Sequence, residues 1–203
     1  MSHENNIQVK EGYYGKKKYN TLPRFISYFY QIDSVSSLGD VKKVLEIGPG
    51  SKLVANELKN IGYEVTTCDF DASVNPDVVA DVRNLPFEDN SFDCIIACQI
   101  LEHVKYNEFE NVLEKMSKIS RKYLIISLPS RHTGFEFILK FPFIQTLLKK
   151  SFIDLNFQVP VKFPGFKESG QHYWEIDFWT TSRSKVESTI KRNFRILSKF
   201  KPP

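Results

Sequence analysis

Cysteine is scarce in this chain of 203 residues. There are three, Cys68, Cys94 and Cys98, and no two of them are spaced as a CxxC pair. All three fall in apolar segments, which favours buried thiols over a disulfide or a metal site. The sequence also lacks an apolar leader of the signal-peptide type and any uncharged run near the ~20 residues that span a bilayer. We therefore expect a cytoplasmic protein without bound metal, and the composition leaves peripheral contact with a membrane open.

An excess of charge of one sign is also lacking, since the net charge is only +4 and the basic residues are scattered. A charge this small does not indicate a nucleic-acid partner, and none is expected. Hydrophobic residues make up 41% of the chain, which is enough for a packed core. The length fits one α/β domain over residues 1–203, and neither a repeat nor a low-complexity tract interrupts it.

Apolar strands and amphipathic helices alternate along the central part of the chain. Continuous apolar segments predict strands in "KKVLEIG", "YEVTTCDFD", "DVVAD", "SFDCIIACQI" and "KYLIISLP". Apolar residues at helical spacing predict helices just after residue 20, in "KLVANELKN" and in "NEFENVLEKMSKI". This alternation predicts a doubly wound, mostly parallel sheet with helices on both faces, whose ligands lie at the carboxyl ends of the strands.

The alternation divides the domain into four parts. Residues 1–38 hold a polar segment and a helix, and residues 39–130 hold the ligand-binding core. Residues 131–177 are an aromatic-rich insertion, which is either core for an extra helical layer or a lid over an apolar or membrane-associated acceptor. Residues 178–203 predict a final helix in "SRSKVESTIKRN" and a strand in "FRILSKF".

A glycine turn, "GPG" at residues 48–50, follows the first predicted strand. A dinucleotide turn requires G-x-G-x-x-G, but the third position is Leu53 and Pro49 removes an N–H donor. A P-loop requires Gly-Lys-Ser/Thr, which "GSK" does not supply. A ligand with positive charge and a ribose diol fits better, because Glu46 stands at the turn and Asp69 ends the second strand. S-adenosylmethionine has both features.

Four segments, "VLEIGPG", "VTTCDFD", "DVRNLPFEDNSFDCIIACQILEHV" and "LIISLPS", resemble the successive motifs of class I S-adenosylmethionine-dependent methyltransferases. The most similar group is the small type-11 set, and the resemblance covers residues 40–130 well. It implies seven strands of which the last is antiparallel. Because the sequence stops just after the predicted sixth strand, we expect either a truncated chain or a sheet that is finished differently. The usual third glycine of the family is Lys52 here.

The resemblance also implies the residues that bind the cofactor. They are Glu46, Gly48, Pro49 and Gly50 at the methionine end, Asp69 at the ribose, Phe70, Asp81 and Val82 at the adenine, and Cys98 and Gln99 at the end of the fourth strand. Three histidines, His103, His132 and His172, are placed near the same crevice and are candidate general bases. The pair Glu102-His103 is either the start of a surface helix or a site beside the transferred methyl.

We therefore expect methyl transfer from S-adenosylmethionine to a small-molecule, lipid or glycan acceptor. Two other hypotheses stay open. One is a non-catalytic, methyltransferase-like module that binds the cofactor or a partner. The other is a nicotinamide-dependent oxidoreductase, against which the missing third glycine argues. No oligomeric state is predicted.

Overall fold

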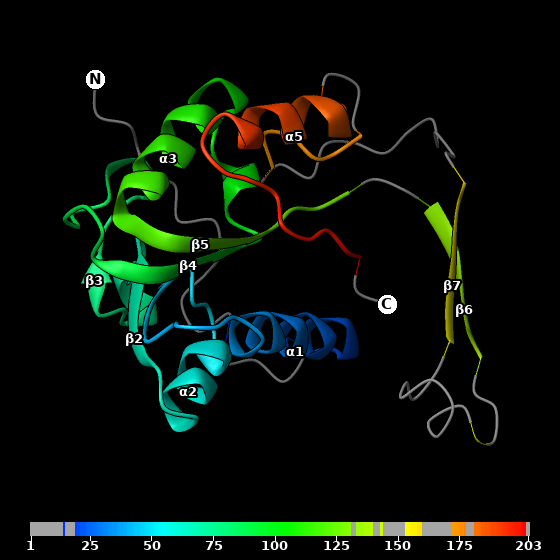
Figure 1. Ribbon diagram of the computed structural model, residues 1–203, viewed down its shortest axis with the longest axis horizontal. Coiled ribbons are helices and arrows are strands. Elements are labelled where there is room, and N and C mark those ends of the chain that lie inside the picture. The colour runs from blue at the N-terminus through cyan, green and yellow to red at the C-terminus, as the bar shows by residue number, and fades with distance from the viewer. Residues whose placement is uncertain are drawn as a thin grey trace.

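The computed structural model describes residues 14, 19–130, 133–139, 143, 153–159, 172–177 and 181–201. Its central sheet has five parallel strands in the order β3-β2-β1-β4-β5 (Figure 1). The strands are β1 (Lys43–Ile47), β2 (Glu64–Asp69), β3 (Val78–Val79), β4 (Phe92–Cys98) and β5 (Ser120–Ser127). All five agree with the strands predicted from the apolar segments. The strand order changes direction between β1 and β4, which places a ligand crevice at the carboxyl ends of these two strands.

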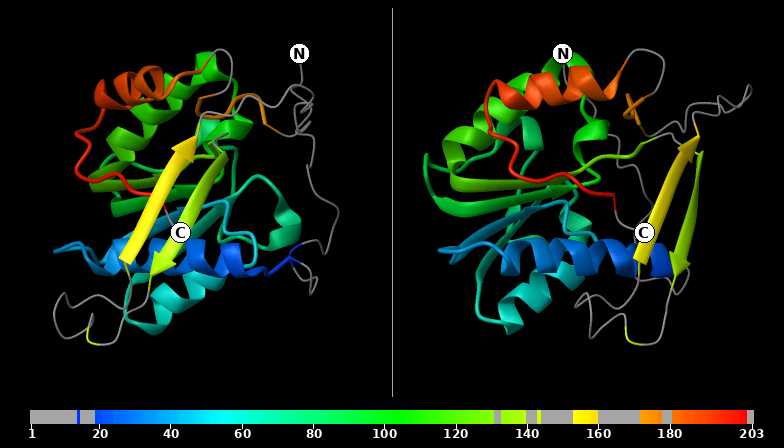
Figure 2. Two further views of the ribbon diagram at one scale, coloured as in Figure 1. Left: turned by 90° about the vertical axis from the view of Figure 1, so that its right-hand side faces the viewer. Right: turned by 45° about the vertical axis from the view of Figure 1, so that its right-hand side comes forward.

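Helices cover both faces of the sheet, as predicted. On one face lie α1 (Leu22–Ser36) and α2 (Leu53–Asn60), and on the other lie α3 (Tyr106–Ile119) and α5 (Arg183–Lys191) (Figures 1 and 2). Successive residues of β1 point to opposite faces, so Val44 packs with α1 and α2 whereas Leu45 packs with α3. The sheet is therefore buried on both sides, which explains why its strands are continuous apolar segments.

Short 3₁₀ turns connect the strands at the edge where the crevice lies. They are η1 (Ala72–Val74), η2 (Val82–Asn84) and η3 (Leu101–His103). Each follows a strand directly or within a few residues, so each brings its polar side chains to the carboxyl edge of the sheet.

The aromatic-rich insertion contains a second, separate sheet. Two antiparallel strands, β6 (Thr133–Leu139) and β7 (Ile153–Val159), pair with Thr133 opposite Val159. They stand apart from the main sheet, on the side to which the carboxyl end of β5 points (Figures 1 and 2). The predicted extra helical layer is therefore wrong for these two stretches. The side chains of β6 and β7 lie outside the described residues, and the predicted lid stays a prediction.

The predicted strand "FRILSKF" is also wrong. Residues 194–200 have no regular structure, and the N–H of Phe194 donates to the carbonyl of Ile190 at the end of α5. Leu197 is 62% exposed, and Lys199 forms an ion pair with Glu187 of α5 at 2.8 Å. The segment is thus tied to a helix by a side chain instead of to β5 by a backbone ladder, and the main sheet has five strands within the described part of the chain.

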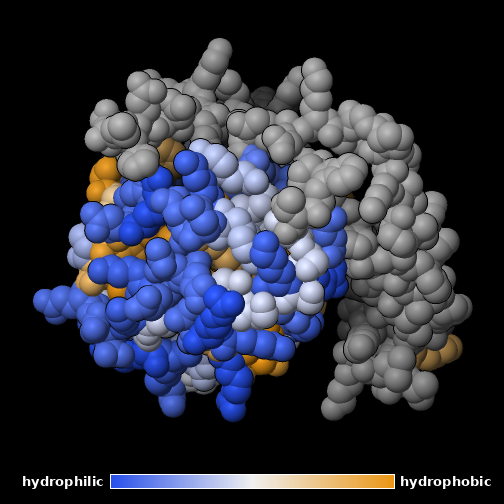
Figure 3. All heavy atoms as spheres, turned by 90° about the horizontal axis from the view of Figure 1, so that it is seen from above, coloured by the Kyte–Doolittle hydropathy of each residue, from blue (hydrophilic) through white to orange (hydrophobic). Residues whose placement is uncertain are grey.

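The described surface seen from above in Figure 3 is mainly hydrophilic, and its apolar residues form small patches. Within the ranges that the structure describes, no helix is both long enough and apolar enough to cross a membrane.

Candidate functional site

The glycine turn after β1 requires glycine at both positions. Gly48 and Gly50 have φ angles of +72° and +48°, in the left-handed region that other residues rarely adopt. A Cβ on Gly48 would lie 2.0 Å from Cδ1 of Ile100, and one on Gly50 would lie 3.2 Å from the ring of Tyr14. The backbone is therefore approached closely on both sides, by the chain after β4 and by the N-terminal segment.

Lys52, which replaces the family's third glycine, also has a left-handed backbone, with a φ of +59°. It is the residue before α2, and its N–H donates to the carbonyl of Pro49 at 2.7 Å. Its Nζ donates to the carbonyl of Asn75, in the turn after η1. The position keeps the conformation that favours glycine, while the side chain links the glycine turn to the connection between β2 and β3.

Glu46 lies beneath the turn and is buried, with 4% of its surface exposed. Burial raises the pKa of this carboxyl to about 8, although a hydrogen bond from the Ala55 amide and the charge of Lys59 oppose the rise. Its Oε2 atom has no hydrogen-bond partner among the described residues. A buried carboxylate oxygen without a partner is a favourable place for a cationic group of a ligand.

Asp69 ends β2 at the same edge of the sheet and is also buried. Its Oδ1 accepts a hydrogen bond from the Asp71 amide at 2.9 Å, and burial raises the pKa of its carboxyl. The ring of Phe70, the next residue, is 38% exposed. A buried carboxylate and a partly exposed aromatic residue therefore stand next to each other here, and their roles at the ribose and the adenine stay predictions.

Asp81 follows β3 and caps η2, with its Oδ1 accepting from the amide of Arg83 at 2.8 Å. The Arg83 guanidinium also forms an ion pair with Asp81 at 2.5 Å. Arg83 is not among the site residues predicted from the sequence. Its guanidinium would compete with an adenine for the Asp81 carboxylate. Val82 is half-buried and packs against the core.

The chain turns sharply after β4. Gln99 has a φ of +57°, its amide donates to the carbonyl of Ser127 at 3.0 Å, and its Nε2 donates to the Ser127 hydroxyl at 3.2 Å. The pKa of the Cys98 thiol is raised to about 12, mainly by burial and to a smaller extent by the charges of Glu46 and Glu102, while hydrogen bonds with Ser127 oppose the rise. These two carboxyl groups therefore flank Cys98, at the point where the strand order changes.

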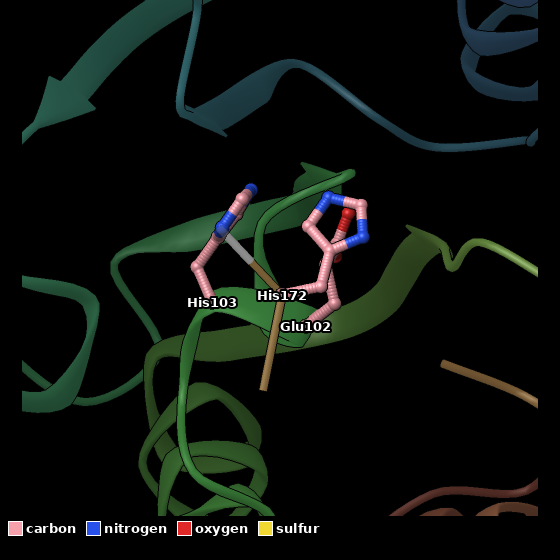
Figure 4. A group of neighbouring side chains, drawn as sticks. All are labelled: Glu102, His103 and His172. Atoms are coloured by element: carbon pink, nitrogen blue, oxygen red, sulfur yellow. The ribbon is translucent and has the colours of Figure 1, made fainter. Parts of the chain in front are cut away.

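Glu102, in η3, is fully buried, so its interpretation as the start of a surface helix is wrong. Neither carboxylate oxygen has a hydrogen-bond partner among the described residues. Burial raises the pKa of this carboxyl to about 8. The next residue, His103, is half-buried, and its ring centroid lies 4.9 Å from that of His172 (Figure 4). Two of the three predicted histidines are thus together, and His132 lies outside the described residues.

The segment that carries His172 is fixed to η3 and to the end of β5. The Tyr173 amide donates to the carbonyl of Glu102 at 2.9 Å, and the Trp174 indole donates to the carbonyl of Val104 at 2.8 Å. Trp174 is 3% exposed and packs in the main core. These contacts explain how a histidine that is distant in sequence reaches the carboxyl end of β4.

The imidazole of His172 has a carboxylate partner that the sequence reasoning missed. Its Nδ1 lies 2.8 Å from Oε1 of Glu175, which is 9% exposed. The His-x-x-Glu spacing of the sequence is the pattern that could have predicted this pair. A carboxylate on one ring nitrogen sets the tautomer and orientation of the ring, which leaves the other nitrogen to act as a base or a ligand.

Comparisons with known proteins agree with this architecture. Residues 45–123 match the family described as "Methyltransferase domain". The crystal structure of the PH0226 protein from Pyrococcus horikoshii is similar over 91% of this chain and 86% of that protein, with a TM-score of 0.51 and 15% identity. This likeness shows the fold.

Two shorter similarities involve smaller parts of the matched proteins. A methyltransferase from Archaeoglobus fulgidus that depends on S-adenosylmethionine is 17% identical, with a TM-score of 0.43, over 57% of this chain and 53% of that protein. An uncharacterized protein of Methanocaldococcus jannaschii is 33% identical over 49 residues, which are 24% of this chain and 22% of that protein. The chain thus spans about half of one of these proteins and about a fifth of the other.

The described sheet and helices thus have a doubly wound α/β fold, and residues 45–123 are similar to a methyltransferase domain.

Proposed function

We propose that the protein transfers a methyl group from S-adenosylmethionine to a small-molecule, lipid or glycan acceptor. The observation that carries this proposal is the buried carboxylate of Glu46 under the glycine turn, with one oxygen unpaired among the described residues. S-adenosylmethionine has an ammonium group and a sulfonium centre at the end that faces this turn in the family. A cationic group there would stabilise the ionised carboxylate, which burial alone disfavours.

The same carboxylate argues against the nicotinamide alternative. A dinucleotide places its anionic pyrophosphate at the glycine turn, close to the N-terminus of the following helix. Here that position would bring two negative phosphates toward Glu46, and repulsion between like charges is strong where burial lowers the dielectric. The ribose carboxylate, Asp69, would serve either ligand and does not separate the two hypotheses.

The cofactor supplies an already activated methyl group, so the residues of the chain position the acceptor and remove its proton. The acceptor atom would form its bond to the methyl carbon as the carbon–sulfur bond breaks, and the electron pair of that bond would remain on sulfur. For a hydroxyl or protonated amine acceptor, the proton would pass to an imidazole at the carboxyl end of β4. His103 and His172 are the candidates, and the carboxylate of Glu175 orients the ring of His172.

The proposal is tested by binding of S-adenosylhomocysteine to the wild-type chain and to Asp69→Asn, measured by calorimetry. The asparagine side chain would keep an oxygen that accepts from the Asp71 amide but would lose the charge, so we expect about tenfold weaker binding. Asp89→Asn, which changes an exposed carboxylate in the turn before β4 and away from the carboxyl ends of the strands, is the matched control and should bind as the wild type does.

Turnover separates an enzyme from a non-catalytic module. Production of S-adenosylhomocysteine is measured with extracts fractionated into small molecules, lipids and glycans. Tight binding of S-adenosylhomocysteine without production in any fraction would favour the binding module. Binding of NADH in place of S-adenosylhomocysteine would contradict the proposal.

A further inference from the structure

We propose that Glu102, His103 and His172 form a binding site for one divalent transition-metal ion. One ligand atom of each residue lies within 4.8 Å of those of the other two. The two imidazoles come from η3 and from the segment at residue 172, and the carboxylate of Glu102 lies beside them (Figure 4). This combination of two histidines and one carboxylate is a common ligand set for zinc and for iron or manganese.

The carboxylate of Glu102 is the strongest indication of a missing partner. It is 0% exposed, and neither of its oxygens accepts a hydrogen bond within the described residues. Buried carboxylates are normally paired, hydrogen-bonded or bound to metal, because desolvation of an isolated charge is costly. A cation between Glu102 and the two imidazoles would satisfy both oxygens at once.

His172 is already oriented in the way that metal-bound histidines are. Its Nδ1 is 2.8 Å from the carboxylate of Glu175, and a proton on Nδ1 would leave the lone pair of Nε2 for a metal ion. Glu175 is itself buried, with 9% of its surface exposed. A carboxylate behind a ligand histidine raises the basicity of the ring and increases metal affinity.

The two halves of the site are held together by the fold. The Tyr173 amide donates to the carbonyl of Glu102 at 2.9 Å, and the Trp174 indole donates to the carbonyl of Val104 at 2.8 Å. These bonds lie immediately next to the proposed ligands on both chain segments. The ligands therefore stand on backbone that is already fixed before a metal binds, which reduces the entropy lost on binding.

The distances set the adjustment that binding requires. Bonds of about 2.0–2.2 Å from a central ion to nitrogen and oxygen place neighbouring ligand atoms about 3.4 Å apart. The present separations of up to 4.8 Å would shorten by at most about 1.4 Å, and rotation of the half-buried imidazoles would supply this change. Three ligands also leave coordination positions open.

The location of the metal site indicates what the open coordination positions bind. This step rests on the proposed function. The site directly follows β4, and Glu102 lies close enough to Cys98 to raise the pKa of its thiol. An acceptor oxygen in an open position would be held at this end of the strand, and coordination would lower the pKa of its hydroxyl. With a metal bound, the hydroxyl proton would pass to solvent, because the two imidazoles are then occupied as ligands. The inference thus indicates an acceptor that offers an oxygen.

Metal binding is measured without reference to turnover. The protein is prepared without a histidine tag and stripped with a chelator, and Zn²⁺ and Mn²⁺ are titrated calorimetrically, with Mg²⁺ as the hard-cation contrast. We expect one Zn²⁺ or Mn²⁺ per chain and weaker binding of Mg²⁺. His172→Ala and Glu102→Gln should weaken binding at least 100-fold, and Glu175→Gln should weaken it about 10–100-fold.

Matched controls remove residues of the same type elsewhere. Glu114→Gln changes an exposed carboxylate that pairs with Lys118 on α3, and His3→Ala removes a histidine of the N-terminal segment. Both should keep the affinity of the wild type. Equal affinities of the wild type, His172→Ala and Glu102→Gln, or no binding of Zn²⁺ and Mn²⁺ by the wild type, would overturn the proposal.

Thermal unfolding shows whether each variant is folded. Without metal, Glu102→Gln should melt at or above the wild-type temperature, because it removes a buried carboxyl group whose oxygens have no hydrogen-bond partner among the described residues. With Zn²⁺ the wild type should gain stability and Glu102→Gln should not. A clear loss of stability for metal-free Glu102→Gln would contradict the proposal. Binding of S-adenosylhomocysteine to the same variants should be unchanged, which separates failure of the metal site from failure of the proposed function.

Discussion

Substitution of Glu46 by glutamine should change how the stability of the protein depends on pH. The native pKa of this carboxyl is about 8, above its ordinary value of 4.5. Between these two values the folded state holds a proton that the unfolded state has released. The free energy of unfolding of the wild type therefore falls as the pH rises from about 4.5 to about 8, and Glu46→Gln should lack this part of the fall.

The magnitude follows from the difference between the two pKa values. At about 1.36 kcal/mol for each pH unit, the full difference corresponds to at most about 5 kcal/mol. Relaxation of the surroundings and entry of water reduce the cost of a buried charge, so we expect roughly 2–4 kcal/mol. Glutamine keeps an oxygen that can accept from the Ala55 amide, which Glu46 does in the native protein.

The assay is urea unfolding at pH 5 and at pH 8, with a chelator present so that the surroundings of Glu102 are the same in both proteins. The stability of Glu46→Gln relative to the wild type should rise by the stated amount between the two pH values. Glu57→Gln, at an exposed position of α2, is the control and should follow the wild type. If Glu46→Gln also follows the wild type, the carboxyl does not titrate between pH 5 and 8 and the argument from burial is refuted.

Two further predictions concern the packing around Gly48 and the burial of the three thiols. Gly48→Ala should lose about 2–4 kcal/mol of unfolding free energy, because the φ is +72° and the new Cβ would lie 2.0 Å from Cδ1 of Ile100. Gly39→Ala, whose Cβ would meet nothing within 4 Å, should change it by less than about 1 kcal/mol, and equal losses in the two variants would contradict this explanation. The thiols of Cys68, Cys94 and Cys98 should react slowly with a thiol reagent at pH 8, because burial raises their pKa values to about 11, 12 and 12. Denaturant should make all three react quickly, and fast labelling of the native protein would show that burial does not protect them.

The parallel sheet could be predicted because its strands are short, unbroken apolar segments that alternate with amphipathic helices. The segment of β4 is apolar without a break, as a strand buried on both faces requires, and the structure forms it at Phe92–Cys98. The position of Glu46 and Asp69 at strand ends followed from the same argument. Lys52 stands where the family that the sequence resembles has a glycine, and its φ of +59° shows that the position has the left-handed conformation that favours glycine.

The errors arose where long-range contacts decide the outcome. Glu102 follows a strand and precedes an amphipathic helix, so a local pattern predicts an exposed helix start. It is buried because the segment around Trp174, distant in sequence, covers η3. Residues 194–200 have apolar residues that suit a strand, but a strand also needs a neighbour with free backbone groups. No sequence pattern specifies that neighbour.

The two points at which the chain leaves and rejoins the main sheet lie side by side. The Ile176 amide donates to the carbonyl of Pro129 at 2.9 Å, and Ser130 and Ile176 form an isolated parallel bridge. The two ends of the stretch between them are thus held together. Each doubling of the length of such a loop adds only about 0.6 kcal/mol to the entropic cost of closing it. Related proteins could exchange the part of this stretch that precedes His172 for one of another length or composition and keep the strand ends and the histidine pair intact. The acceptor could then differ between related proteins while the residues proposed to bind the cofactor stay the same.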